Sequence, residues 1–290
     1  GARAAKDLYE IIASDVDFVI VTTPPNARLD IVEHLARAGK PILMEKPVER
    51  NLQNARALVD ICAQNDVRFG IMLQHRARPI VNQLRRHLDD LGDIHVVEVS
   101  VPWWRDQSYY DAPGRGTYER DGGGVLISQA IHTLDLMLSL TGPVKTVSAL
   151  AATSKSHHME AEDFVSAGLR FASGAVGHLF ATTSAYPGRG ETITLHCAKG
   201  SVTLEAGTLQ IDWRDGRTQT IGQAATSGAG ADPMAFTSDW HQWVIEDFAQ
   251  SIAENRPCLV TGAEALKVHA LIDALERSSK SGTICTVDAG

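Results

Sequence analysis

The first third of the chain alternates short apolar runs with helical patterns, and this alternation constrains the fold more than any other feature. Almost continuously apolar runs, typical of parallel strands buried on both faces, cover residues 18–22, 41–44 and 67–73. Helical patterns follow these runs over residues 26–38, 52–64 and 79–88. We expect Asn26 to cap the first of these helices. Strands and helices in this order predict a parallel α/β sheet.

From residue 94 onward the pattern changes to consecutive short strands. Alternating apolar and polar residues predict strands over 94–101, 144–152, 163–172, 175–184, 191–198, 201–206 and 208–213. The last six are joined by short turns and predict an antiparallel sheet of about six strands. Helical patterns over 238–255 and 263–280 follow, with a last strand at 283–287. We therefore expect two domains, residues 1–93 and residues 94–290, the second an α+β domain with a large, mainly antiparallel open sheet.

The composition argues against several classes of function. The chain has 27 basic and 35 acidic residues and a net charge of −8, so we expect neither nucleic acid nor a membrane as a partner. Its four cysteines are widely spaced and form no CxxC pair, so we expect no disulfide framework and no metal site. We find no apolar run of bilayer length and no signal-peptide core, and the sparse cysteines fit a reducing compartment, so we expect a cytoplasmic protein.

Unusual side chains gather where the three predicted parallel strands end. The strand ends contain the segments Thr22-Thr23-Pro24-Pro25-Asn26, Glu45-Lys46-Pro47 and Gln74-His75-Arg76. Ligands of parallel sheets bind at the carboxyl ends of the strands, so we expect a binding site along this edge.

A glycine-rich turn at residues 122–124 leads into the most informative helical pattern. Glycines allow a tight turn and a close approach of the backbone to a ligand. Ser128, Gln129 and His132 follow at spacings of three and four, so they can share one face of a helix. His132 is a candidate acid/base because an imidazole titrates close to neutral pH.

Three of these segments, in this order, resemble the Gfo/Idh/MocA family of oxidoreductases (glucose–fructose oxidoreductase and inositol dehydrogenase-like proteins). They are residues 21–26 after a buried strand, residues 45–47 after the next strand, and residues 122–135 ahead of the antiparallel sheet. The helical segments 248–257 and 261–266 are also similar to the family's C-terminal helices. The resemblance covers essentially the whole chain.

The resemblance implies a Rossmann-type N-terminal domain that binds NAD or NADP. It also implies a second domain whose open sheet joins copies of the chain into a homodimer or homotetramer. The expected fold class is therefore α/β, a partial Rossmann-type parallel sheet followed by an α+β domain. By the same resemblance the chain begins inside the Rossmann domain, because no glycine-rich turn precedes residue 18. Roughly two βα units, on the order of 60 residues, would be absent, and we expect the chain as given to bind a dinucleotide poorly.

The resemblance also implies roles for individual residues. His132 is the expected acid/base and Lys46 its electrostatic partner beside the substrate hydroxyl, and the Lys46–Pro47 bond is expected to be cis. Expected cofactor contacts are Thr22, Thr23, Pro24, Pro25, Asn26, Glu45, Lys46 and Gln74, with Arg76 also bordering the nicotinamide side. Expected substrate contacts are Arg105, Tyr110, Ser128 and Gln129. The implied reaction interconverts a secondary alcohol and a ketone on a sugar, a sugar derivative or a cyclitol.

Ser128 departs from the family pattern, in which many members have aspartate four residues before the histidine. Serine can hydrogen-bond but cannot offset the charge of an imidazolium, so the sequence leaves the substrate class open. Two other functions stay open as well. One is a non-catalytic, dinucleotide-binding regulator or scaffold of the same fold, and the other is a lyase or hydrolytic enzyme that uses bound NAD transiently.

Overall fold

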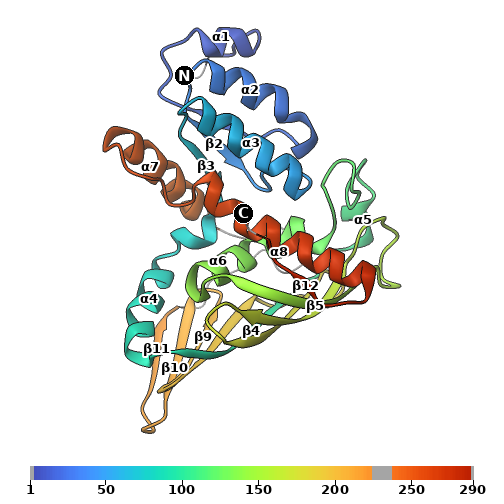
Figure 1. The fold of residues 1–290 in the computed structure, drawn as a ribbon, viewed down its shortest axis with the longest axis vertical. Coiled ribbons are helices and arrows are strands. Elements are labelled where there is room, and N and C mark those ends of the chain that lie inside the picture. The colour runs from blue at the N-terminus through green and yellow to red at the C-terminus, as the bar shows by residue number, and fades with distance from the viewer. Residues whose placement is uncertain (1–2, 224–236, 289–290) are drawn as a thin grey trace.

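The computed structural model describes residues 3–223 and 237–288, which form a small parallel sheet and a large mixed sheet with helices between them (Figure 1). The parallel sheet has the order β1-β2-β3, with Val19 opposite Ile42 and Ile42 opposite Phe69. Its strands are β1 (Val19–Val21), β2 (Ile42–Glu45) and β3 (Phe69–Met72). The predicted parallel sheet of the first domain is thus confirmed. Within the described residues β1 pairs only with β2, and Ile20 on β1 is 40% exposed.

Helices connect these strands and set the position of their carboxyl ends. They are α1 (Leu8–Ile12), the 3-10 turn η1 (Pro25–Ala27), α2 (Leu29–Arg37), α3 (Leu52–Gln64), the 3-10 turn η2 (Gln74–Ala77) and α4 (Pro79–Leu91). The helix predicted over residues 52–64 is confirmed residue for residue, because the Asn51 side chain caps it by accepting from the Asn54 amide at 2.9 Å. The prediction that Asn26 caps α2 is wrong. Asn26 lies inside η1, and α2 begins after Arg28 without a side-chain cap.

The second sheet has nine strands among the described residues, in the order β11-β10-β9-β8-β4-β7-β6-β5-β12. They are β4 (Ile94–Pro102), β5 (Val144–Ala152), β6 (Phe164–Phe171), β7 (Val176–Thr182), β8 (Thr192–Cys197), β9 (Gly200–Glu205), β10 (Thr208–Trp213), β11 (Thr218–Gly222) and β12 (Cys285–Thr286). All neighbours are antiparallel except β4 and β7, which pair in parallel with Val96 opposite Val176.

The expected six-stranded antiparallel sheet therefore understates the real one. The sequence pattern missed β11, which is largely exposed on both faces and so shows no alternation of apolar and polar residues. It also did not indicate that β4 lies in the middle of the sheet, because a parallel pairing between distant strands leaves no local signal.

The last two helices of the described chain, α7 (Asp239–Ala253) and α8 (Gly262–Ser281), return to the first unit. In Figure 1 α7 lies beside β3, whereas α8 crosses between the two sheets and runs along β5. The segment between them pairs with β3, where the Ile71 amide donates to the Val260 carbonyl at 3.0 Å. One continuous hydrophobic core consequently joins the two parts of the chain, and it positions the carboxyl ends of β1–β3 against the helix α6 (Ile131–Thr141). In the described part of the chain no helix is both long and apolar enough to cross a membrane.

Candidate active site

Lys46 follows β2 and reaches from the parallel sheet to the second unit. Its Nζ donates to the carbonyl oxygen of Ser128 at 2.6 Å. The Lys46–Pro47 bond is cis, as expected from the family resemblance. Burial lowers the pKa of the partly buried Lys46 amine to about 8; Arg115 and Arg28 lower it further, whereas Glu45 and Asp121 oppose the shift.

The glycine-rich turn packs against the protein's own backbone. A Cβ atom at Gly124 would lie 1.7 Å from the Glu162 carbonyl oxygen, and one at Gly122, where φ is +86°, would lie 2.5 Å from the Arg50 backbone. The Glu162 carboxylate also accepts from the amides of Gly124 and Leu126, both at 3.1 Å. The expectation that the glycines make room for a ligand is therefore wrong. Gly124 makes room for residue 162, which holds the start of the helix, and Gly122 makes room for the backbone of Arg50.

The helix after this turn begins with a π-helical segment, Leu126–Ala130, before it becomes the regular helix α6. The regular helix expected from residue 125 is corrected accordingly. Single π turns inside helices occur often at functional sites, because they displace side chains from the regular spacing. Here the Ser128 carbonyl contacts Lys46, and the Gln129 side chain is buried, with its Oε1 lacking a hydrogen-bond partner among the described residues.

His132 lies in the first turn of α6 and is 7% exposed. Burial holds the pKa of His132 well below its usual range, and the charges of Lys46 and Arg78 add to this effect. Its Nδ1 is buried and has no hydrogen-bond partner in the described part of the chain. The ring is therefore neutral near pH 7, which is the form that can accept a proton.

A second histidine, His75, lies against His132, with 5.0 Å between ring centroids. Arg78 donates to His75 Nε2 and to the Glu191 carboxylate, the latter at 2.8 Å, and its guanidinium carbon lies 4.1 Å from the centroid of the Trp240 ring. The sequence did not predict a role for these side chains. Arg78 and Glu191 thus form a buried ion pair beside His75, on the element that precedes α4.

Arg76 and Asp135 form a buried ion pair that links elements of the two parts of the chain. Arg76 holds the Asp135 carboxylate with two hydrogen bonds of 2.6 and 2.7 Å and contacts Glu264 at 3.1 Å. The three residues join η2, α6 and α8. Arg76 is 6% exposed and its guanidinium is held in this ion pair, and its place beside the nicotinamide stays a prediction.

The expected cofactor contacts lie along the carboxyl edge of the parallel sheet. Thr22, Pro24 and Asn26 are exposed there, Thr23 and Glu45 are partly buried, and Pro25 is buried. Thr23 Oγ1 and Gln74 Oε1 are buried without a hydrogen-bond partner among the described residues. Thr23 follows β1 and Gln74 follows β3, so the two residues lie on either side of Lys46, which follows β2. A hydrogen-bonding nicotinamide amide fits such an edge.

Two of the expected substrate contacts, Arg105 and Tyr110, belong to the aromatic loop between β4 and the glycine-rich turn. Arg105 is 5% exposed and lies near the rings of Trp103 and Tyr109, at 5.2 and 5.7 Å. The Tyr110 hydroxyl shares a hydrogen bond of 2.7 Å with Thr183 Oγ1, and burial raises its pKa. Both side chains thus have contacts within the protein, and their role toward a substrate stays a prediction.

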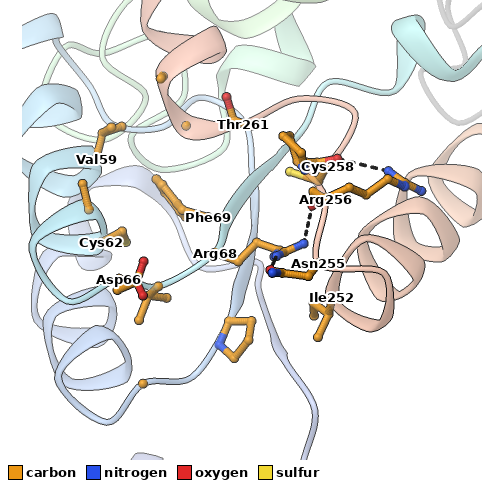
Figure 2. A pocket seen from close by; sticks show the side chains of 17 residues that line it. Val59, Cys62, Asp66, Arg68, Phe69, Ile252, Asn255, Arg256, Cys258 and Thr261 are labelled. Atoms are coloured by element: carbon orange, nitrogen blue, oxygen red, sulfur yellow. Dashed lines mark hydrogen bonds between the residues drawn. The ribbon is translucent and has the colours of Figure 1, made fainter.

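A pocket of about 680 Å³ lies at the opposite end of the parallel sheet, where Asp66, Arg68 and Phe69 meet Asn255 and Cys258 (Figure 2). It is lined by residues that precede β2 and β3, whereas Lys46 follows β2. It is therefore separate from the site around Lys46 and His132.

The parallel sheet with its polar carboxyl edge, the partly buried Lys46 and the buried His132 fit a dinucleotide-dependent oxidoreductase. Residues 1–73 match the domain described as "Oxidoreductase family, NAD-binding Rossmann fold", and residues 81–203 match the "GFO/IDH/MocA C-terminal domain". The chain belongs to the Gfo/Idh/MocA family of oxidoreductases. This confirms the family resemblance, the fold class, the enzyme class and the NAD(P) type of cofactor.

Individual relatives extend over nearly the whole chain. Inositol 2-dehydrogenase of Rhizobium meliloti is 27% identical over 92% of this chain and 79% of the relative, and levoglucosan dehydrogenase of Pseudarthrobacter phenanthrenivorans is 24% identical over 91% and 78%. The crystal structure of the WlbA dehydrogenase from Bordetella pertussis, in complex with NADH and UDP-GlcNAcA, has a TM-score of 0.81. It is 28% identical to this chain, and the match covers 99% of this chain and 84% of that structure.

Several side chains at the site had no signal in the sequence. Arg28 is the clearest example, because an arginine at the start of a surface helix is usually solvated, whereas here it is 2% exposed and bonds the ends of two strands. Glu191 is separated from Arg78 by over a hundred residues. His75 could have been found, since it lies next to Gln74 at a strand end where ligands bind.

Proposed function

We propose that this protein interconverts a secondary alcohol and a ketone on a sugar, a sugar derivative or a cyclitol, with NAD or NADP as the hydride carrier. The observation that carries the proposal is the contact of Lys46 Nζ with the Ser128 carbonyl. That contact fixes an ammonium group between the carboxyl edge of the parallel sheet and the helix that carries the neutral His132. The names of the relatives, inositol 2-dehydrogenase and levoglucosan dehydrogenase, support a cyclic polyol as the substrate class.

His132 and Lys46 have complementary tasks in this proposal. The neutral imidazole of His132 accepts the proton of the substrate hydroxyl during oxidation and returns it during reduction. The Lys46 ammonium lies beside the same oxygen and stabilises the negative charge that develops there. When bound, the nicotinamide supplies the acceptor for the hydride that leaves the alcohol carbon. Because Lys46 is held by the backbone carbonyl of Ser128, this contact does not depend on the side chain at position 128.

Buried polar atoms that lack a hydrogen-bond partner among the described residues support an assignment of ligand contacts. We assign Thr23 and Gln74 to the nicotinamide side, together with the rest of the strand-end segments, residues 22–26 and 45–46. Gln129 and Ser128 lie one turn before His132, and the buried Gln129 Oε1 lacks a partner among the described residues, so both are suited to substrate hydroxyls. Arg105 and Tyr110 complete the proposed substrate contacts from the aromatic loop.

The open face of the large sheet is the proposed contact between copies of the chain. Val96 and Val176 lie directly opposite each other on β4 and β7 and are 37% and 43% exposed, and Leu150 on β5 is 60% exposed. Apolar side chains on neighbouring strands of an uncovered face favour self-association, most simply as a symmetric homodimer or homotetramer.

A panel of cyclitols and sugars, assayed with NAD⁺ and NADP⁺ on the full-length protein, tests the proposed function. We expect at least one polyol to reduce the nicotinamide and to give a ketone, identified by mass spectrometry as a product lacking two hydrogen atoms. Lys46→Ala and His132→Ala should each lower kcat by about 10²–10⁴-fold. Turnover that is unchanged in both variants would refute the assignment of these two residues.

A further inference from the structure

Arg28 is a buried cation whose guanidinium bonds the backbone at the ends of two strands. The residue lies between η1 and α2 and is 2% exposed. Its Nε donates to the Thr23 carbonyl at 2.9 Å, and its Nη1 donates to the Glu45 carbonyl at 2.6 Å and also to the Pro47 carbonyl. Thr23 follows β1, whereas Glu45 and Pro47 flank the residue that follows β2.

These bonds enclose Lys46. Glu45 and Pro47 are its two neighbours in the chain, and a single guanidinium nitrogen bonds both of their carbonyl groups. On the other side, the Val48 amide donates to His269 Nε2 of α8 at 3.1 Å. The backbone of Lys46 is therefore fixed by contacts from two directions, while its side chain extends to Ser128.

Burying a guanidinium costs desolvation free energy, which its hydrogen bonds to the loop must offset. Burial lowers the pKa of Arg28 to about 10, although Glu45 and Glu49 favour its charged form. A planar guanidinium with several N–H groups in fixed directions can bond separate carbonyl groups at once, whereas an ammonium group has no such fixed fork. The geometry gives a reason for arginine at this position.

We propose that Arg28 is a positioning residue for Lys46, which places the ammonium group of Lys46 at the reacting centre by fixing the carbonyl groups on both sides of it. This inference rests on the proposed role of Lys46. Arg28 touches neither the substrate nor the cofactor in this proposal. It acts through the loop, and its charge also contributes to the low pKa of Lys46.

Two substitutions at position 28 distinguish the effect of the guanidinium geometry from the effect of its positive charge. Arg28→Lys keeps the positive charge but loses the fork, so kcat should fall by about 10²-fold, as expected for a displacement on the scale of 1 Å. Its alkaline limb in a plot of log kcat/KM against pH should stay in place. Arg28→Gln removes the charge as well, so the limb should move to higher pH because the pKa of Lys46 rises.

Arg68 provides a matched control at the other end of the sheet (Figure 2). Its guanidinium also donates to backbone carbonyls, those of Ser251 and Arg256, and to Asn255 Oδ1 at 3.1 Å. Arg68→Gln should lower the melting temperature, but it should leave kcat and the pH limb unchanged. A role of Arg28 in stability alone predicts the same result for both arginines.

The outcomes distinguish this inference from the proposed function. If Lys46→Ala is inactive while Arg28→Lys and Arg28→Gln keep the wild-type kcat and pH limb, only the inference about Arg28 is overturned. If Lys46→Ala is fully active, the proposed function and this inference fall together. Should Arg28→Gln not fold, the kcat of the charge-preserving Arg28→Lys variant, compared with Arg68→Gln, still decides the matter.

Discussion

Lys46 differs from an ordinary surface lysine because its amine is partly buried and has a fixed acceptor, the Ser128 carbonyl. Since desolvation disfavours the charged form, the pKa of Lys46 is lowered to about 8. The amine therefore changes charge within the range in which an enzyme can be assayed, and its charge state becomes an experimental handle on the mechanism.

The pH dependence of alcohol oxidation distinguishes two roles of Lys46. If Lys46 acts as a cation, kcat/KM should fall as pH rises through about 8, because the ammonium form is lost. The measurement is initial velocity against pH, with a deuterated alcohol to confirm that hydride transfer is observed. Lys46→Arg should lack this limb, since arginine stays charged. A rate that instead rises through pH 8 and loses this rise in Lys46→Arg would make the neutral amine the base.

His269 of α8 is hydrogen-bonded to the loop after Lys46. Its titration makes the free energy of unfolding depend on pH in the acid range. Its Nε2 accepts the Val48 amide and must remain unprotonated, and burial lowers its pKa from 6.5 to about 4. Between these two values the unfolded chain binds a proton that the folded chain does not. Stability is therefore lost as pH falls from about 6.5 to 4, by up to about 3 kcal/mol from this group.

Urea unfolding at several pH values measures the effect of His269. His269→Gln keeps a hydrogen-bond acceptor but cannot titrate, so its stability should decline less than that of the wild type over this pH range. His178→Gln, at an exposed position on β7, serves as the control and should follow the wild type. Equal acid dependence in the wild type and His269→Gln would contradict this account.

At the scale of elements, the helix that carries His132 is held at its start by a residue from a distant segment. Glu162 precedes β6, and its carboxylate and carbonyl bond the amides of Gly124, Val125 and Leu126. This contact meets the need for acceptors at a helix N-terminus. It also requires glycine at position 124, because the two backbones are in contact there.

Gly124→Ala tests this packing. The added methyl would lie 1.7 Å from the Glu162 oxygen, so the variant should lose more than about 3 kcal/mol of unfolding free energy. Gly168 on β6 is the matched control, because a Cβ there meets no heavy atom within 4 Å. Gly168→Ala should be unchanged or more stable by up to about 1 kcal/mol. Similar stability in both variants, measured by urea unfolding, would contradict the proposed contact.

Elements with local signals were predictable from the sequence. The helix at residues 52–64 has a capping asparagine and a regular apolar face, and the strand at residues 144–152 has a clear alternation, so both bounds agree with the structure. The π-helical segment was not predictable, since its start depends on Glu162, which is more than thirty residues away. The strand β11 was missed because it is mostly exposed on both faces.

The residues of the candidate site divide in the same way, into those with a local sequence signal and those that depend on long-range contacts. Lys46 and His132 could be proposed from the sequence because each lies in a recognisable segment, at a strand end and in a helix after glycines. Arg28 and the His75–Arg78–Glu191 contacts depend on long-range packing that no local pattern records. The glycines were noticed for the wrong reason, since the sequence shows that a close approach occurs but not which group approaches.

At the scale of the whole molecule, the open face of the nine-stranded sheet should determine the oligomeric state. We expect the wild-type protein to form a homodimer or homotetramer in sedimentation velocity. Val176→Asp should dissociate it, because a charge would be buried without a partner. Leu29→Asp, at a 49% exposed position on α2, is the control and should not change the assembly. A monomeric wild-type protein would contradict the proposed interface.

Direct transfer of hydride from substrate carbon to nicotinamide is the central claim, and isotope transfer tests it most directly. The protein is incubated with an oxidised nicotinamide cofactor and a cyclic polyol that carries deuterium on the oxidised carbon. We predict that mass spectrometry finds the deuterium on the reduced nicotinamide ring, and that the label is lost with Lys46→Ala and His132→Ala. An absence of label in the cofactor pool throughout the panel of polyols would contradict the claim and favour a binding protein or transient use of the cofactor.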